Sequence, residues 1–261
     1  MQLLTQASLY FSNPHVLALI LIAGFLWCRP APYLRILWVL LFTLILNKVL
    51  QSVYQVPFLP TVDHRGWGFP SGHMQAATVF WAAAAWEYRK PWFYGIAALI
   101  LTSVGISLVQ HGYHSQSDVF AALEFGLGTV MIYYLSQIAL RKQSHQSLAS
   151  LGLYMAILSA IIFPFVSLNH PFLWAIMGVL IGFPLSLLAS SSILANHYPT
   201  PKERLYRTGL VVIGLVVFYP FEHYGLSQLH PLTYQFLRTL LISAYIGGFV
   251  PVMTQKRRKG L

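Results

Sequence analysis

Residues 91–110 read PWFYGIAALILTSVGISLVQ and contain no charged side chain. An α-helix needs about 20 apolar residues to cross the hydrocarbon core of a bilayer, so this segment is predicted to span a membrane. The whole chain has the same character, because 57% of its 261 residues are hydrophobic and only 8% are charged. Soluble domains have about 45–50% apolar and about 25% charged residues. This composition excludes a soluble globular protein, a disordered chain and a nucleic-acid-binding module, despite the net charge of +10.

Apolar runs between polar breaks predict about nine transmembrane helices and therefore an all-α, polytopic membrane bundle. Pro164 and Pro184 lie inside two of the runs, where neighbouring helices can satisfy the freed carbonyl groups. We expect a catalytic helical core over residues 1–142 and additional helices over residues 148–261. The nine runs are 14–28, 34–50, 72–88, 91–110, 117–140, 148–168, 171–194, 208–221 and 232–251.

Basic residues mark alternate ends of these spans, and cytoplasmic ends of membrane helices are enriched in Lys and Arg. We therefore expect an outer N-terminus and a cytoplasmic C-terminus. The first 28 residues contain no Lys or Arg, so we expect the first apolar run to stay as a span rather than act as a signal peptide. The marking residues are Arg29, Arg35, Arg89, Lys90, Arg141, Lys142, Lys202, Arg204, Arg207 and the tail Lys256, Arg257, Arg258 and Lys259.

Three basic residues, Lys48, Arg65 and Arg238, fall on the outer side against this rule. Binding of an anionic ligand is a natural reason for such an exception. The single cysteine, Cys28, excludes a disulfide framework and a thiolate metal site.

One outer loop ends in Pro-Ser-Gly-His at residues 70–73, directly before a predicted helix. The free N–H groups at the start of a helix favour an anion, and Gly72 allows close approach of a ligand. Ser71 can cap the helix, and His73 is placed to give a bound anion a proton. A plain turn with a capping serine and an interfacial histidine is the alternative.

The other outer loop carries His114 and Asp118, four residues apart, so that one helical turn brings them to one face. A carboxylate that binds one ring nitrogen of a histidine fixes the tautomer and makes the other nitrogen a better nucleophile. The pair alone is also compatible with an ordinary polar contact. Together with Pro-Ser-Gly-His on the same side it predicts a catalytic site.

These residues resemble the type 2 phosphatidic acid phosphatase (PAP2) superfamily, which includes lipid phosphate phosphatases, glucose-6-phosphatases and vanadium haloperoxidases. The family pattern is Lys-x6-Arg-Pro, Pro-Ser-Gly-His and Ser-Arg-x5-His-x3-Asp. The residues of this chain that match the pattern are Lys48, the segment Phe69–His73, Ser107, His114 and Asp118. The resemblance covers about residues 40–125.

The resemblance implies a role for each matching residue and requires no metal and no cofactor. His114 would attack phosphorus to form a phosphohistidine, with Asp118 orienting it and His73 protonating the leaving alcohol. Lys48, Ser71 and Gly72 would bind the phosphoryl oxygens.

Both family arginines are missing, because Gln55 and Leu108 occupy their places. Arginine can clamp the charge-rich transition state through two hydrogen bonds. The hypothesis is that Arg65 replaces the missing guanidinium as a phosphate-binding residue, or alternatively that Arg238 does. A lipid-headgroup contact is the other interpretation of Arg65, and an intramembrane ion pair that of Arg238.

The expected function is therefore removal of phosphate from a lipid phosphate or lipid diphosphate at the outer face of a membrane. We expect the inner membrane of a bacterium, with the site facing the periplasm. The expected partners are the lipid substrate and membrane lipids, not nucleic acid. Two alternatives stay open: headgroup transfer between lipids, resembling the sphingomyelin synthases, and a non-catalytic lipid-binding protein.

Overall fold

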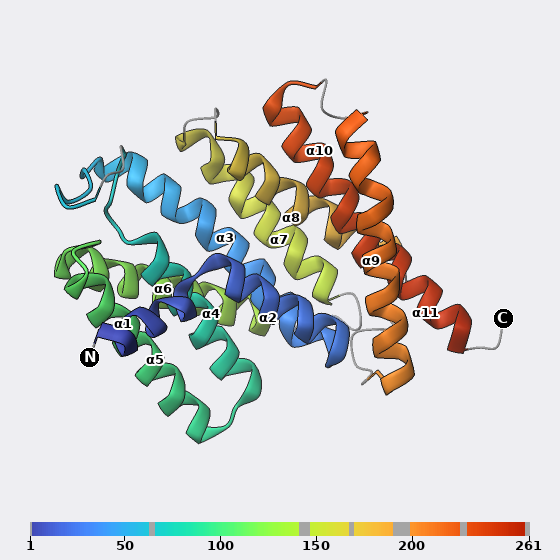
Figure 1. Ribbon diagram of the computed structural model, residues 1–261, viewed down its shortest axis with the longest axis horizontal. Coiled ribbons are helices and arrows are strands. Elements are labelled where there is room, and N and C mark those ends of the chain that lie inside the picture. Colours follow the sequence, from blue (N-terminus) through green and yellow to red (C-terminus); the bar gives the residue numbers. More distant parts are fainter. Residues whose placement is uncertain are drawn as a thin grey trace. The chain divides into compact units, whose positions relative to one another are not determined.

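The computed structural model describes residues 2–62, 66–140, 147–166, 170–189, 199–224 and 229–258 (Figure 1). Apart from one isolated β-bridge between Pro57 and Trp67, regular structure in these residues is helical. The expected all-α fold is confirmed.

Eleven α-helices and three shorter helical segments follow one another along the described parts of the chain. The α-helices are α1 (Gln2–Leu9), α2 (Pro14–Trp27), α3 (Pro30–Tyr54), α4 (Gly72–Tyr88), α5 (Pro91–Gln110), α6 (Gln116–Leu140), α7 (Ser147–Ile162), α8 (Pro171–Ala189), α9 (Pro201–Tyr224), α10 (Pro231–Ala244) and α11 (Val250–Arg258). The shorter segments are 3₁₀-helices at Tyr10–Ser12 and Phe163–Phe165 and a π-helix at Tyr245–Phe249.

Proline opens many of these helices. It is the first residue of α2, α3, α5, α8, α9 and α10. Proline lacks an N–H group, but the first N–H groups of a helix have no partner within the helix, so this position suits it. The runs predicted to begin at residues 34 and 208 therefore begin earlier, at Pro30 and Pro201.

Six helices in the described parts of the chain are long and apolar enough to cross a membrane. The number is seven if the bent pair of α1 and α2 counts as one span. The expected count of nine also includes α4, which has 17 residues, and α9, whose first turns carry charges. By the length and apolarity of these helices, the chain is an integral membrane protein.

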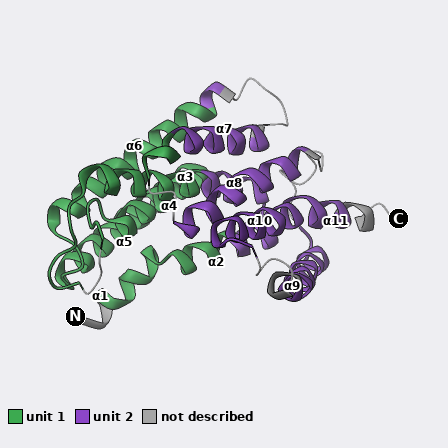
Figure 2. Cartoon of the chain, turned by 90° about the horizontal axis from the view of Figure 1, so that it is seen from above, with its two compact units in different colours: residues 1–21, 39–137, 162–166 green, residues 22–38, 138–161, 167–261 purple. Residues whose placement is uncertain are grey.

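The chain divides into two compact units (Figure 2). Unit 1 comprises residues 1–21, 39–137 and 162–166, and unit 2 comprises residues 22–38, 138–161 and 167–261. The predicted boundary near residue 142 separates a catalytic core from additional helices. A division into compact units does not test such a difference in function, so this boundary stays a prediction.

The helix α4 forms the core of unit 1, because most of its side chains are buried on all sides. Small residues allow close packing: a Cβ atom on Gly126 of α6 would lie 2.7 Å from Thr78 of α4. The Trp81 indole N–H donates to the carbonyl of Phe11 at 3.0 Å. These contacts hold α4 firmly and so position its N-terminus.

In unit 2, α8 and α10 approach closely along a pair of glycines four residues apart. A Cβ atom on Gly182 would lie 2.6 Å from the Leu240 carbonyl oxygen, and one on Gly178 would lie 2.5 Å from that of Phe236. The Thr239 hydroxyl donates to the Ala175 carbonyl at 2.8 Å. Small residues at such spacing are typical of helix contacts within membranes.

Candidate active site

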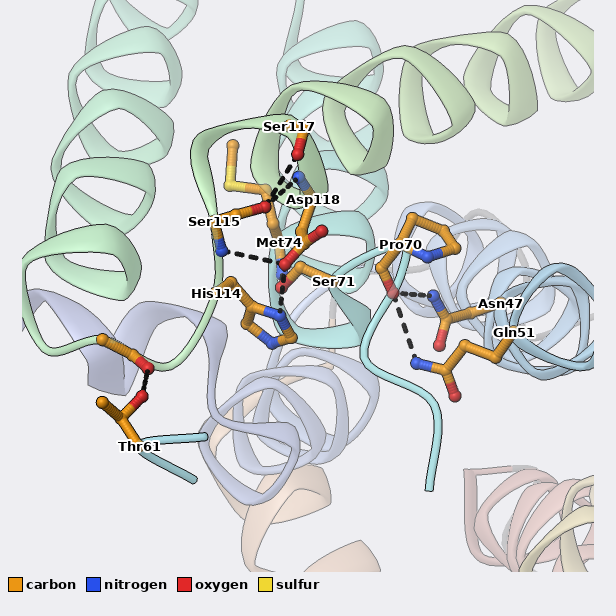
Figure 3. A network of polar contacts seen from close by, with 11 residues as sticks. Asn47, Gln51, Thr61, Pro70, Ser71, Met74, His114, Ser115, Ser117 and Asp118 are labelled. Carbon is orange, nitrogen blue, oxygen red and sulfur yellow. Dashed lines mark hydrogen bonds and ion pairs between the residues drawn. The ribbon is translucent and has the colours of Figure 1, made fainter. Parts of the chain in front are cut away.

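The beginnings of α4 and α6 are joined by a backbone hydrogen bond. The N–H of Ser71 donates to the carbonyl of Asp118 at 3.2 Å. Ser71 and Asp118 are 0% and 8% exposed, so water competes little for this bond. The bond brings two motifs that are separated in the sequence by α4 and α5 to one place (Figure 3).

His114 and Asp118 form the pair that their spacing predicts. Nδ1 of His114 lies 3.6 Å from Oδ2 of Asp118, just beyond hydrogen-bond distance. The same carboxylate oxygen accepts the backbone N–H of Ser115 at 2.8 Å, and the Ser115 hydroxyl accepts the N–H of Asp118 at 3.2 Å. This reciprocal cap fixes the carboxylate, so Nδ1 faces Asp118 while Nε2 points away from it (Figure 3).

Burial lowers the pKa of His114, because its imidazole is only 6% exposed and the charged form loses hydration. The Asp118 carboxylate acts in the opposite direction and raises the pKa, while His73 lowers it. The net direction is down from the ordinary value. His114 is therefore neutral at neutral pH, as a nucleophile must be.

The start of α4 has the geometry of an anion site. The Ser71 hydroxyl caps the helix by accepting the N–H of Met74 at 3.4 Å. The N–H groups of Gly72 and His73 belong to the first helical turn, where no carbonyl within the helix is available to them. His73 is exposed and lies within electrostatic range of His114. A phosphoryl group bound here would meet both histidines.

Side-chain amides fix the loop before α4, and sequence reasoning missed them. The Asn47 amide donates to the Pro70 carbonyl at 3.1 Å and to the Gln75 amide oxygen at 2.9 Å. The Gln51 amide donates to the same Pro70 carbonyl at 3.2 Å. A Cβ atom on Gly72 would lie 3.0 Å from the Asn47 amide oxygen, so an added side chain would push against this amide.

Lys48 belongs to the same network. Its ammonium group donates to the Gln51 amide oxygen at 2.8 Å and lies within electrostatic range of His73. Lys48 is thus tied through Gln51 to the loop before α4, and its role in binding phosphoryl oxygens stays a prediction. Polar residues in an apolar span are usually functional. Asn47 and Gln51 lie in such a span, and this pattern in the sequence could have indicated them.

The segment between α3 and α4 also packs on the loop that carries His114. The Thr61 hydroxyl donates to the Gly112 carbonyl at 2.6 Å. The rings of Phe58 and His114 have centroids 6.0 Å apart. Gly112 has a φ of 66°, a left-handed conformation that favours glycine. Phe58 and Thr61 therefore help to position the histidine, and no pattern in the sequence indicates them.

The two residues at the positions of the missing family arginines differ in exposure and in contacts. Gln55 is exposed at the C-terminal end of α3 with a φ of 51°. Leu108 is buried, and its carbonyl accepts the N–H groups of Tyr113 at 3.1 Å and His114 at 3.3 Å. Ser107, which matches the family serine, contacts the Ser8 hydroxyl of α1 at 2.6 Å.

Of the two candidate replacement arginines, the structure describes only Arg238. Arg65 lies outside the described residues, so its role stays a prediction. Arg238 is part of α10 in unit 2, where its guanidinium carbon lies 6.0 Å from the centre of the Tyr234 ring. In the described parts of the chain, no group of three His, Cys, Asp or Glu residues could hold a metal ion.

Comparison with known proteins agrees with the motifs. Residues 32–144 match the family model of the PAP2 superfamily. This segment of the chain is PAP2-like. The matched segment runs from α3 to beyond α6 and contains every candidate site residue from Lys48 to Asp118. No curated protein and no solved structure matches the chain.

Proposed function

We propose that this PAP2-like protein is a membrane phosphatase that removes phosphate from a lipid phosphate or lipid diphosphate through a phosphohistidine. One observation carries the proposal. The hydrogen bond from Ser71 to Asp118 holds the anion-binding start of α4 beside the His114–Asp118 pair. An anion site beside an oriented neutral imidazole is what nucleophilic phosphoryl transfer needs.

In the first step, the Nε2 lone pair of His114 attacks phosphorus and the bond to the ester oxygen breaks. The protonated imidazole of His73 gives its proton to the leaving alcohol. The Asp118 carboxylate stabilises the positive charge that develops on the His114 ring. Lys48, the N–H groups of the first turn of α4 and Arg65 stabilise the phosphoryl oxygens.

In the second step, water attacks the phosphorus of the phosphohistidine. His73, now neutral, accepts a proton from that water, and the bond between phosphorus and Nε2 breaks. Inorganic phosphate leaves, while His114 becomes neutral and His73 protonated again. No metal or other cofactor takes part in this scheme.

The surroundings of the site support a lipid substrate. Lys48 is part of α3, and the loop of His114 joins α5 to α6. The helices α3, α5 and α6 are all long and apolar enough to span a membrane. A substrate with an apolar tail can enter such a site from the bilayer. The distribution of basic residues supports a site on the outer face, which would be the periplasmic face in a Gram-negative bacterium.

Transfer of a phospho-headgroup to a lipid alcohol is a second candidate, favoured by the absence of both family arginines at Gln55 and Leu108. The chemistry at His114 would be the same, with a lipid hydroxyl in place of water. A non-catalytic lipid-binding protein would not depend on His114.

Phosphate release from a panel of lipid phosphates by the detergent-purified protein tests the proposal. We expect release that His114→Ala abolishes and that His111→Ala preserves. His111 is a matched control in the same loop, since its ring stacks on Tyr113 and contacts the Ser107 carbonyl. Turnover only with an added lipid alcohol would instead establish a transferase. Absence of turnover in both assays would leave lipid binding as the function.

A further inference from the structure

A cavity of about 730 Å³ lies between α5 and α6 in unit 1. Ligand pockets measure about 300–1,000 Å³, so this volume is large enough for a ligand. From α5 it is lined by Ala98, Thr102 and Ile106, and from α6 by Val119, Phe120 and Leu127. We call it the α5–α6 groove.

Four residues of the groove wall are close in sequence to the candidate site residues. The wall includes Met74, the residue after His73, and Val119, the residue after Asp118. Gln110 and Gln116 also line it, and they are the two helix ends that flank the loop of His114. The end of the groove nearest the site is therefore polar, and the rest is mainly apolar.

The dimensions fit one hydrocarbon chain. Along α5, from Ala98 to Gln110, the groove extends about 18 Å at 1.5 Å per residue. The hydrocarbon core of a bilayer is about 30 Å thick, so a single leaflet contributes about half of that. A chain that follows the groove from the polar end would reach roughly the middle of the membrane.

We propose that the α5–α6 groove binds one hydrocarbon chain of the lipid phosphate whose phosphate reacts at His114. This rests on the proposed function and narrows the substrate class to amphiphiles with at least one long, slender chain. The chain leaves the phosphate beside Gln110 and Gln116 and packs against Thr102 and Phe120. Gly105 lets α5 and α6 pack closely at this wall, because a Cβ atom there would lie 3.2 Å from a methyl group of Val119.

Obstruction of the groove should discriminate between chain lengths. We compare the wild-type protein with Thr102→Trp, using palmitoyl and hexanoyl lysophosphatidic acid in mixed detergent micelles. Thr102 is exposed, so the fold has room for the indole. We expect kcat/KM for the palmitoyl substrate to fall by about tenfold, the lower end of what a hydrophobic pocket discriminates, with the hexanoyl substrate unchanged.

The matched control is Leu99→Trp. Leu99 belongs to the same helix and is 69% exposed, but it does not line the groove. This variant should treat both substrates as the wild type does. Equal losses for both chain lengths in Thr102→Trp, or no loss for either, would overturn the groove as the chain site.

A second measurement does not depend on turnover. Palmitoyl lysophosphatidic acid with a photoreactive diazirine at the chain end is cross-linked to the His114→Ala protein, with excess unlabelled lipid as competitor. We expect competed cross-links on α5 and α6 that Thr102→Trp removes and Leu99→Trp keeps. Cross-links elsewhere, or unaffected by Thr102→Trp, would refute the groove. Absence of phosphate release with these cross-links present would refute only the proposed function.

Discussion

At the scale of single residues, the protonation of His114 controls the proposed reaction. Only the neutral imidazole attacks phosphorus, and burial lowers the pKa of His114 from its ordinary value of about 6.5. A lowered pKa keeps the neutral form populated at more acidic pH, so activity is lost as the pH falls through this lowered value. We predict an acid limb of the kcat/KM profile below about pH 6.5, measured as phosphate release across pH. An acid limb centred above that value would contradict the assignment.

The variant Asp118→Asn separates two effects of the carboxylate. Loss of the charge removes the interaction that raises the pKa of His114, so the acid limb should move to still lower pH. Loss of ring orientation and charge stabilisation should reduce kcat by about 10²–10⁴-fold. Ser117→Ala, an exposed change in the same turn, is the control. A loss of kcat without a shift of the acid limb would mean that Asp118 does not act on the pKa of His114.

Asn47 should matter although it touches no reacting atom. Asn47→Leu removes the donor to the Pro70 carbonyl and to Gln75, which costs about 1–3 kcal/mol for buried groups left unpaired. We expect a lower Tm and a kcat reduced by about tenfold or more, because the start of α4 loses its support.

Gln55→Ala is the control for that variant, since Gln55 is an exposed amide near the end of the same helix. It should leave kcat and Tm unchanged. Equal behaviour of the two variants would show that the amide network does not position the site.

Local patterns in the sequence indicate His73, His114 and Asp118 as candidate residues, because each pattern acts over one helical turn. The residues that support them are far apart in sequence. Asn47 meets Pro70, and Thr61 meets Gly112, only through the packing of α3, α4 and α5. No periodicity encodes such contacts, so the structure was needed to find them.

At the scale of elements, glycine decides how closely α8 and α10 pack. The predicted effect of Gly182→Ala is a destabilisation of about 1–3 kcal/mol, because a Cβ atom would overlap the Leu240 carbonyl. Thermal unfolding in detergent measures it. Gly209→Ala in α9 is the matched control, since nothing lies within 4 Å of the added Cβ atom. An unchanged Tm for Gly182→Ala would mean that the two helices separate at little cost.

Apolar runs predicted the existence of the helices better than their ends. The run from 208 missed the first turns of α9, because Lys202 and Arg204 make those turns polar. The run from 34 missed the first four residues of α3, two of which are prolines. The prolines at residues 30 and 201 mark the true starts. The α-helix within the predicted run 148–168 likewise ends early, at Ile162. A 3₁₀-helix that contains Pro164 follows it, because proline disrupts the hydrogen bonds of an α-helix.

At the scale of the whole molecule, the orientation in the membrane is testable with single cysteines. In a Cys28→Ser background, a cysteine that replaces Tyr113 should react with an impermeant maleimide on intact cells. Tyr113 is 46% exposed in the loop of His114. A cysteine that replaces Lys90, in the turn between α4 and α5, should react only after permeabilisation. The reverse pattern would place the site in the cytoplasm.

The most direct test of the central claim is to find the phosphoryl group on the protein. The protein is mixed with phosphorus-labelled palmitoyl lysophosphatidic acid, quenched rapidly in alkali and digested for mass spectrometry. We predict a phosphoryl group on Nε2 of His114, absent from His114→Ala and retained in His111→Ala. Phosphate release without any label on His114, or with the label on another residue, would contradict the proposed mechanism.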